Sequence, residues 1–125
     1  MRDEFDKVIA KFGQAWVDRD PDTVMSLVAH DNLQYFETNF DPPTTDWDEV
    51  KKLWDVVPTN QKDITWRHKI VLVDGNKALA HAQVNRTKLP SGTKEISDCA
   101  FLFGFDKDNK INYFRQWRSV ITKEN

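Results

Sequence analysis

The sequence predicts an α+β fold, with helices in the first half of the chain and an antiparallel sheet in the second. Apolar residues recur at spacings of three and four in the first half, and from Ile64 onward they recur at every second position. Turn-forming residues separate the later segments. The 125 residues are a usual length for one domain. We therefore expect residues 1–125 to form a single domain.

Two helices open the predicted fold. The apolar residues between Phe5 and Trp16 form one stripe of an amphipathic helix. Asp20 followed by Pro21 indicates a second helix start, because a carboxylate can accept hydrogen bonds from free backbone N–H groups and proline has no N–H to satisfy. The apolar residues of this short helix are Val24, Leu27 and Val28.

A short strand and a third helix follow. Residues Leu33 to Thr38 favour a strand, which the prolines at positions 42 and 43 interrupt. Asp46, with Glu49 three residues later, is a capping-box pattern that begins a helix. We expect Pro58 to end this helix, because a proline ring cannot continue it.

The rest of the chain predicts a meander of four strands. Runs of Gly, Pro, Asn and Asp at positions 74–76, 90–92 and 106–109 mark the turns between them. The expected strands are Ile64 to Val73, Lys77 to Leu89, Thr93 to Phe105 and Lys110 to Ile121.

Alternation of apolar and polar residues predicts which side of each strand faces the core. On the strand from Lys77 the even-numbered residues are apolar and mostly small, whereas the odd-numbered set is largely polar. A four-residue turn at positions 90–93 would pair Leu89 with Lys94 and place Ala82 opposite Phe101. The residues expected to face inward are Ala78, Ala80, Ala82, Val84, Cys99, Phe101, Phe103 and Phe105.

The register of the preceding strand depends on its loop. A three-residue loop at positions 74–76 would place Leu72, Ile70, His68 and Trp66 on the inner side. A two-residue loop or a β-bulge would reverse this and put His68 and Trp66 outside.

Composition excludes several function classes. Eighteen Lys and Arg stand against twenty Asp and Glu, a formal charge of −2 without a basic run, so we expect no nucleic-acid partner. No apolar stretch approaches the length of a membrane span, so no membrane partner is expected either. The single Cys99 excludes an internal disulfide and favours a cytoplasmic location. No ligand pattern for a metal stands out, and we expect no cofactor.

Several segments resemble the nuclear transport factor two-like superfamily and its SnoaL-like branch, which includes polyketide cyclases, isomerases and dehydratases. The segments are Ala15-Trp16-Val17-Asp18-Arg19-Asp20-Pro21-Asp22, Leu27-Val28-Ala29-His30-Asp31 and Phe103-Gly104-Phe105-Asp106 leading to Lys110-Ile111. The resemblance covers nearly the whole chain. It implies a cone-shaped fold, in which a curved antiparallel sheet wraps around three N-terminal helices and leaves a pocket at its open end.

The chain departs from the catalytic patterns of this superfamily. In the resemblance to its steroid isomerases, the positions of the Tyr and the two Asp fall on Phe12, Phe36 and Phe101, and a phenyl ring can neither donate to an enolate nor accept a proton. In the resemblance to its epoxide hydrolases, the Asp of the last strand falls on Gln116, whose amide can orient a ligand but is not a base near neutral pH.

Aromatic residues from several elements are expected to converge at the open end of the cone. Together with one amide they would make an apolar wall with a polar handle. The expected pocket residues are Phe12, Trp16, Trp54, Trp66, Phe101, Phe114 and Gln116. The alternative is that these rings simply fill the core.

Three side chains near the expected pocket are the candidate catalytic residues: His68, Glu37 and Tyr35. Histidine most readily both accepts and donates a proton near neutral pH. Paired with Glu37, His68 would serve a dehydratase or isomerase. The alternative is a sheet histidine bonded to a neighbour, with Glu37 as a solvated charge. Arg118 is a further candidate near the cavity.

The outer side of the sheet predicts a homodimer interface. Asp98 has the opposite parity to Phe101 and is expected on this side. Apolar, aromatic and Arg residues together are typical of an interface core. The expected interface residues are Leu79, His81, Gln83, Leu102, Tyr113, Arg115 and Trp117.

The sequence therefore predicts a SnoaL-like protein that binds a small hydrophobic or aromatic molecule in the cone, with a lyase or isomerase reaction as one form of this function. Any enzyme of this kind would be a cofactor-independent isomerase, cyclase or dehydratase. The alternative is a non-catalytic module of the same fold, either a ligand sensor or a dimeric assembly domain.

Overall fold

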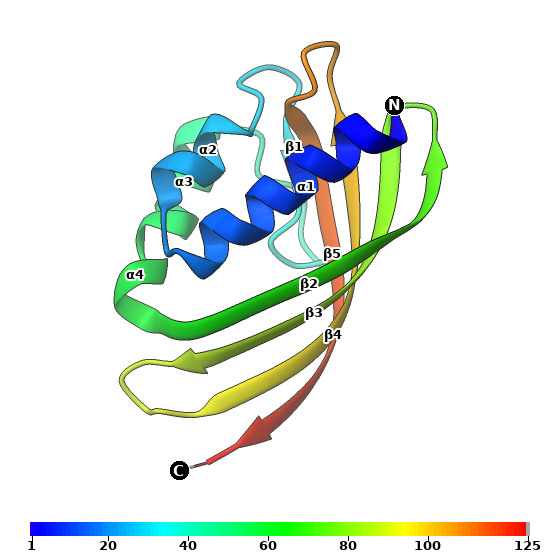
Figure 1. Ribbon diagram of the computed structural model, residues 1–125. Helices are drawn as coiled ribbons and strands as arrows, with labels where there is room; N and C mark the ends of the chain where they lie inside the picture. The colour runs from blue at the N-terminus through cyan, green and yellow to red at the C-terminus, as the bar shows by residue number, and fades with distance from the viewer. Residues whose placement is uncertain (125) are drawn as a thin grey trace.

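The computed structural model describes residues 1–124, with helices followed by strands as predicted (Figure 1). The helices are α1 (Arg2–Val17), α2 (Pro21–Ser26), α3 (Trp47–Asp55) and the four-residue α4 (Val57–Asn60). The strands are β1 (Gln34–Tyr35), β2 (Gln61–Asp74), β3 (Lys77–Lys88), β4 (Lys94–Phe105) and β5 (Ile111–Lys123).

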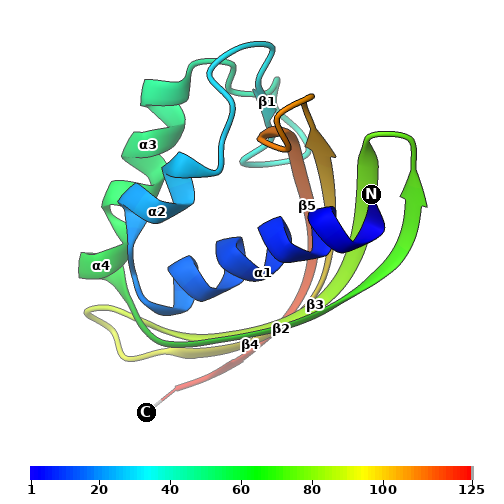
Figure 2. The ribbon, with the colours of Figure 1, turned by 45° about the horizontal axis from the view of Figure 1, so that its top comes forward.

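The five strands form one sheet in the order β1-β5-β4-β3-β2. The four long strands pair antiparallel, and β1 joins the edge parallel to β5. The sheet is strongly curved, and α1 lies in its concavity (Figure 2). This arrangement confirms the predicted α+β class and the cone of a curved sheet around N-terminal helices.

The two predicted helix starts are present. The Asp20 carboxylate accepts hydrogen bonds from the backbone N–H and the hydroxyl of Thr23. Asp46 accepts from the backbone N–H of Asp48, 3.1 Å away. Glu49 does not complete the capping box, because its carboxylate bonds the Lys52 ammonium instead.

The end of the third helix and the first strand differ from the prediction. α3 ends at Asp55, and Pro58 lies inside α4 rather than ending α3. A proline is tolerated there because the first turn of a helix leaves its N–H groups without intrahelical partners. Only Gln34–Tyr35 of the expected strand 33–38 pairs with the sheet.

The register of β3 against β4 is displaced by two residues from the predicted one. Cys99, not Phe101, lies opposite Ala82. The loop begins one residue earlier than expected, since the backbone N–H of Lys88 bonds the carbonyl of Thr93. A shift of two keeps every side chain on its predicted face, and Phe101 is fully buried.

Two irregularities in the pairing of β2 with β3 have opposite effects on which side chains of β2 face inward. The loop has only two residues, because Asp74 pairs with Lys77, and the register shifts by one between Ile70 and Leu72. Trp66 and His68 therefore face inward, as the three-residue loop predicted. Leu72 lies between the loop and this register shift, where the two-residue loop alone decides which side faces inward. It is 61% exposed, so its predicted inward position is wrong.

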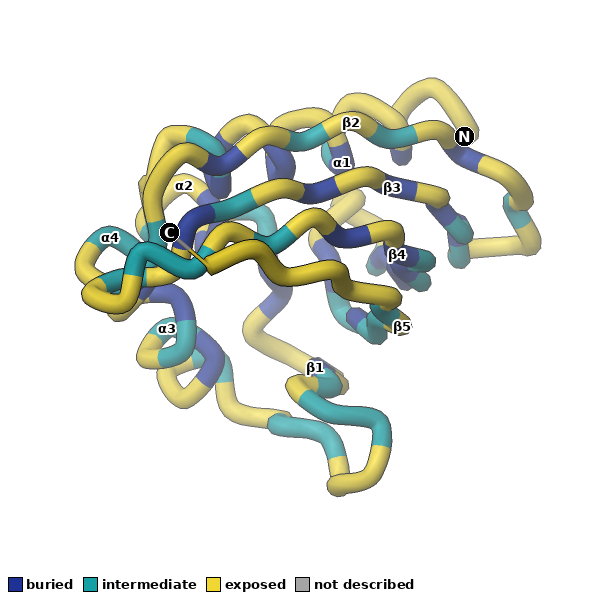
Figure 3. The backbone as a smooth tube through the Cα atoms, turned by 90° about the horizontal axis from the view of Figure 1, so that it is seen from below, coloured by how far each residue is buried: buried dark blue, intermediate teal, exposed yellow. Residues whose placement is uncertain are grey.

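Buried and exposed residues alternate along the central strands (Figure 3). Asp98 and His81 lie on the outer side, as predicted, and contact each other there. The core is aromatic: the ring of Phe12 on α1 contacts the rings of Trp16, Trp54, Trp66, Phe103 and Phe114. No helix within residues 1–124 combines the length and the apolar character that crossing a bilayer requires.

Candidate functional site

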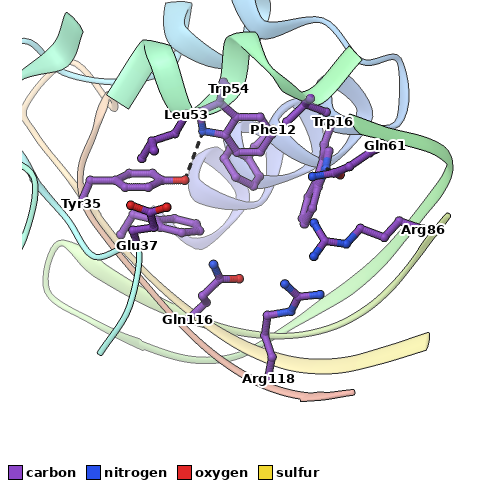
Figure 4. Close-up of a pocket in the computed structure, with 12 residues that line it drawn as sticks. Phe12, Trp16, Tyr35, Glu37, Leu53, Trp54, Gln61, Arg86, Gln116 and Arg118 are labelled. Carbon is purple, nitrogen blue, oxygen red and sulfur yellow. Dashed lines mark hydrogen bonds between the residues drawn. The ribbon is translucent and has the colours of Figure 1, made fainter. Parts of the chain in front are cut away.

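A cavity of about 170 Å³ lies between the helices and the concave face of the sheet (Figure 4). Helices α1, α3 and α4 supply one side of it, and strands β1, β2, β3 and β5 with the segment after β1 supply the other. The lining residues are Phe12, Trp16, Tyr35, Glu37, Leu53, Trp54, Val57, Gln61, Arg86, Phe114, Gln116 and Arg118.

One wall of the cavity is aromatic. Phe12, Trp16 and Trp54 meet edge to face, with ring centroids 5.4 to 6.4 Å apart. Phe114 stacks against Tyr35 with centroids 4.6 Å apart. Their dense mutual contacts fix these rings, so the wall is a preformed apolar surface.

Tyr35 brings one oriented hydroxyl to this wall. Its oxygen accepts a hydrogen bond from the Trp54 indole Nε1, 3.1 Å away (Figure 4). Burial raises the pKa of Tyr35 well above its ordinary value, and the Trp54 hydrogen bond does not offset this. The hydroxyl therefore stays protonated near neutral pH, and because it already accepts from Trp54, it can donate its own proton to a ligand.

Two guanidinium groups form another wall. The Nε atom of Arg86 donates to Glu95 Oε1 at 2.6 Å, and the Nη2 atom of Arg118 is 3.7 Å from the same oxygen. Arg118 Nη2 also donates to the Ser97 hydroxyl at 2.9 Å. Burial alone would raise the pKa of Glu95, but the hydrogen bond to Arg86 and the two positive charges outweigh it and lower that pKa.

Glu37 lies across the cavity from the two arginines, beside Tyr35 (Figure 4). The residue is exposed, so its carboxylate is at the rim. The site is thus amphipathic: an aromatic wall, a basic side and an acidic rim.

His68 lies outside this cavity. Its Nε2 atom is 2.7 Å from Asp6 Oδ1 on α1, and its Nδ1 atom accepts from the Trp66 indole at 2.9 Å. Because an indole N–H can only donate, Nδ1 is the acceptor, and Nε2 is the atom that faces the Asp6 carboxylate. The expected contact of His68 with Glu37 is not present, and the imidazole instead ties α1 to β2.

Two other predicted pocket residues belong to the core. Trp66 and Phe101 contact each other with centroids 5.2 Å apart and do not line the cavity. Trp66 also lies directly against Gly13 of α1. Phe36 lies against Tyr113 and Arg115, away from the cavity, whereas its neighbour Tyr35 lines the cavity.

Arg86 and Gln61 were not among the predicted site residues. A signal for Arg86 exists in the sequence, because position 86 continues the inward-facing even series of Ala82 and Val84. Likewise Arg118 continues the inward series of Phe114 and Gln116. Gln61 had no such signal, because β2 begins three residues earlier than the sequence indicated.

The described residues offer no metal centre: within 1–124 no three His, Cys, Asp or Glu side chains come together as ligands. Cys99 is buried, and burial raises the pKa of its thiol, so it is not an activated nucleophile.

A curved sheet wrapped around helices, with a cavity between the two layers, is the architecture of the nuclear transport factor two-like superfamily. Within it, the sequence model of the SnoaL-like domain matches residues 9–114. The chain therefore belongs to the SnoaL-like domain family.

Solved structures with the same fold include several enzymes. An LEH-like epoxide hydrolase of M. tuberculosis is 17% identical with a TM-score of 0.76, covering 93% of this chain and 83% of that one. A Δ5-3-ketosteroid isomerase of Mycobacterium sp. is 10% identical with a TM-score of 0.72, covering 96% and 98%.

A third structure holds a small ligand. This protein of Catenulispora acidiphila, with a ketosteroid isomerase-like fold, is in complex with trimethylamine; it is 12% identical with a TM-score of 0.74, covering 88% of this chain and 83% of that one. At such identities the likeness shows the fold alone. No curated protein sequence matches this chain closely enough to indicate an activity.

Proposed function

We propose that this SnoaL-like protein binds a small aromatic or hydrophobic molecule in the cavity between α1, α3 and the sheet. The observation that carries the proposal is the aromatic wall of Phe12, Trp16, Trp54 and Phe114 around a space of about 170 Å³. A dry cavity of about 150 Å³ in another protein takes up benzene. The ligand is therefore of the size of one substituted aromatic ring.

Binding can be measured through the tryptophans of the wall. Trp16 and Trp54 line the cavity, so a bound aromatic molecule should quench or shift their fluorescence. We expect Leu53→Trp, which fills the cavity, to abolish binding of benzoate, benzamide and indole. Leu72→Trp is the matched control, because Leu72 is 61% exposed outside the cavity. Equal binding by both variants would place the ligand elsewhere and refute the proposal.

A second candidate function is proton transfer as a cofactor-independent isomerase or lyase. The observation that favours it is the adjacency of a protonated hydroxyl on Tyr35 and a carboxylate on Glu37 at one side of the cavity. Glu37 would remove a proton from carbon while Tyr35 donates to the developing oxyanion. His68 has no part in this proposal, because both of its ring nitrogens already have partners outside the cavity.

Proton exchange tests the second candidate without knowledge of the natural substrate. Phenylacetone carries weakly acidic C–H groups beside a carbonyl, and nuclear magnetic resonance in deuterated water follows their exchange. We expect exchange above the buffer rate in the wild type and none in Glu37→Gln. His68→Ala should leave the rate unchanged. If the wild type exchanges these protons only at the buffer rate, the proton-transfer proposal is refuted and the binding proposal remains.

We also propose that the chain forms a homodimer through the outer side of the sheet. Trp117 there is 44% exposed, and the Arg115 guanidinium lies over the rings of Phe36 and Trp117. The surface consists of Leu79, His81, Gln83, Leu102, Tyr113, Arg115 and Trp117. Because the cavity opens on the other side of the sheet, dimerisation and ligand binding do not compete for the same residues.

A further inference from the structure

We propose that the ligand of the cavity is an anion, a small aromatic carboxylate whose acid group binds Arg118 and Arg86. This inference rests on the proposed binding function and names the class of its ligand. Two independent features of the cavity support it: hydrogen-bond donors without partners, and an excess of positive charge on one wall.

The two guanidinium groups have more N–H donors than the neighbouring acceptors use. An arginine has five N–H groups, yet Arg86 uses its Nε atom on Glu95, and Arg118 uses Nη2 on Ser97 and, more distantly, on Glu95. The Nε atom of Arg118 is buried and has no partner among residues 1–124. Buried polar groups are normally paired, so this donor indicates an absent acceptor. The Oε1 atom of Gln116 in the same cavity is also unpaired within the described residues, and a half-turn of that amide offers its NH₂ group to the same acceptor.

The charge on this wall is also incompletely balanced. Glu95 is one carboxylate shared by two guanidinium groups, and the three side chains are only 11 to 20% exposed. Glu37, the other acid of the site, is exposed on the opposite side of the cavity (Figure 4). The basic wall therefore retains about one positive charge with little solvent to screen it, which favours an anion there.

Geometry favours a carboxylate attached to a ring. The guanidinium groups of Arg86 and Arg118 point into the cavity that Trp16 also lines (Figure 4). A ligand can therefore place its ring against the aromatic wall and its acid against the arginines. A planar guanidinium matches the two oxygens of a carboxylate. A benzoate-sized molecule satisfies both contacts within about 170 Å³.

The primary experiment compares benzoate with benzamide, which has the same shape and no charge. We expect benzoate to bind wild-type protein about ten- to a hundredfold more tightly, because hydrogen bonds to a charged partner contribute about 1.5–3 kcal/mol. Arg118→Gln should remove most of this difference, and Arg118→Lys should keep part of it. Arg67→Gln is the matched control, since Arg67 is exposed and bonds Gln83.

A second variant separates anion recognition from damage to the fold. Glu95 competes with the ligand for both guanidinium groups, so we expect Glu95→Gln to bind benzoate several-fold more tightly and benzamide equally well. Damage to the fold would weaken both ligands in either variant. Opposite effects of Glu95→Gln and Arg118→Gln on benzoate would therefore establish the basic wall as the acid site.

The outcomes distinguish the two proposals. Equal affinity for benzoate and benzamide, unchanged in Arg118→Gln, would overturn the anionic ligand and leave the aromatic cavity standing. Absence of binding by benzoate, benzamide and indole at millimolar concentration would overturn both. Phenyl phosphate tests the oxyanion: tighter binding than benzoate would overturn the carboxylate in favour of a phosphate.

Discussion

The hydrogen bond between Trp54 and Tyr35 joins two side chains that are almost completely buried. Trp54 is 6% exposed and Tyr35 also 6%. Tyr35→Phe would leave the Trp54 N–H buried without a partner. We expect this change to lower the free energy of unfolding by about 1–3 kcal/mol, the usual cost of an unpaired buried donor, as measured by urea titration.

Tyr113→Phe is the control for that measurement. The chain has only two tyrosines, and Tyr113 is half-buried against Phe36 and Lys77 rather than in the cavity. Loss of its hydroxyl should change the free energy of unfolding far less. Equal costs for both variants would show that the Tyr35 hydroxyl does not serve Trp54 as an acceptor.

Glu95 gives the stability of the protein a pH dependence. Its pKa is lowered in the folded protein and lies near 4.3 in an unfolded chain. Its ionised form therefore stabilises the fold above about pH 4.3, and this contribution is lost as the pH falls through the lowered pKa. We expect the free energy of unfolding of the wild type, relative to that of Glu95→Gln, to decrease in this acidic range.

Denaturant titrations of both proteins between neutral pH and about pH 3 measure this difference. Subtracting the Glu95→Gln curve removes the contribution of the other acids, whose environments are the same in both proteins. A difference that stays constant across the range would mean that the two arginines do not hold the Glu95 carboxylate in its ionised form.

Helix α1 approaches β2 closely where Gly13 meets Trp66. A Cβ atom at position 13 would overlap the indole ring of Trp66. Gly13→Ala gains about 1 kcal/mol of helix propensity, but overpacking of this kind costs about 1–3 kcal/mol. We expect a net loss in the free energy of unfolding and a lower Tm.

Two further variants identify the cause of that loss. Gln14→Ala changes the next position, which is exposed and whose side chain bonds the Asp18 carboxylate, and should change the free energy of unfolding little. Trp66→Phe in the Gly13→Ala background gives the new methyl group room and should recover part of the stability. Measured against Trp66→Phe alone, Gly13→Ala should then cost less than it does in the wild type, and an equal cost in both backgrounds would rule out the contact with Trp66 as the reason that position 13 is glycine.

The elements show which features of the fold the sequence could predict. The spacing of apolar residues located the long strands and the first helix. A strand or helix that buries one face needs this spacing whatever its exact pairing. Faces were also predictable: Phe101 is inward and Asp98 outward although the register differs by two residues. The lengths and positions of the loops and the register shift near Ile70 could not be predicted, because local turn energies and small adjustments of strand pairing decide them.

The aromatic side of the site was the part that the sequence predicted most fully. Five of the seven expected pocket residues line the cavity, namely Phe12, Trp16, Trp54, Phe114 and Gln116. Of the basic wall, the sequence singled out Arg118 as a candidate near the cavity but not Arg86, because an arginine near a strand end is ordinarily solvated. The β3–β4 register places Arg86 directly opposite Glu95, and Arg118 on β5 reaches the same carboxylate.

On the scale of the whole molecule, helices cover one side of the sheet, and no element within residues 1–124 covers the other. The outer side exposes Trp117 and, towards the end of the sheet, Ile96 and Ile121. A second copy of the chain would bury these groups. We expect sedimentation to give twice the 14.7 kDa mass of the chain, and Trp117→Glu to give the mass of a monomer, because a charge would then lie in the apolar part of the interface.

Val56→Glu is the control for dimerisation, because Val56 is 48% exposed between α3 and α4, away from the outer side of the sheet. It should sediment as the wild type does. Benzoate affinity should be unchanged in the Trp117→Glu monomer, since no residue of the outer side lines the cavity. A wild-type chain that sediments as a monomer at high concentration would refute the dimer, and a loss of benzoate binding in Trp117→Glu would show that the cavity needs the second copy.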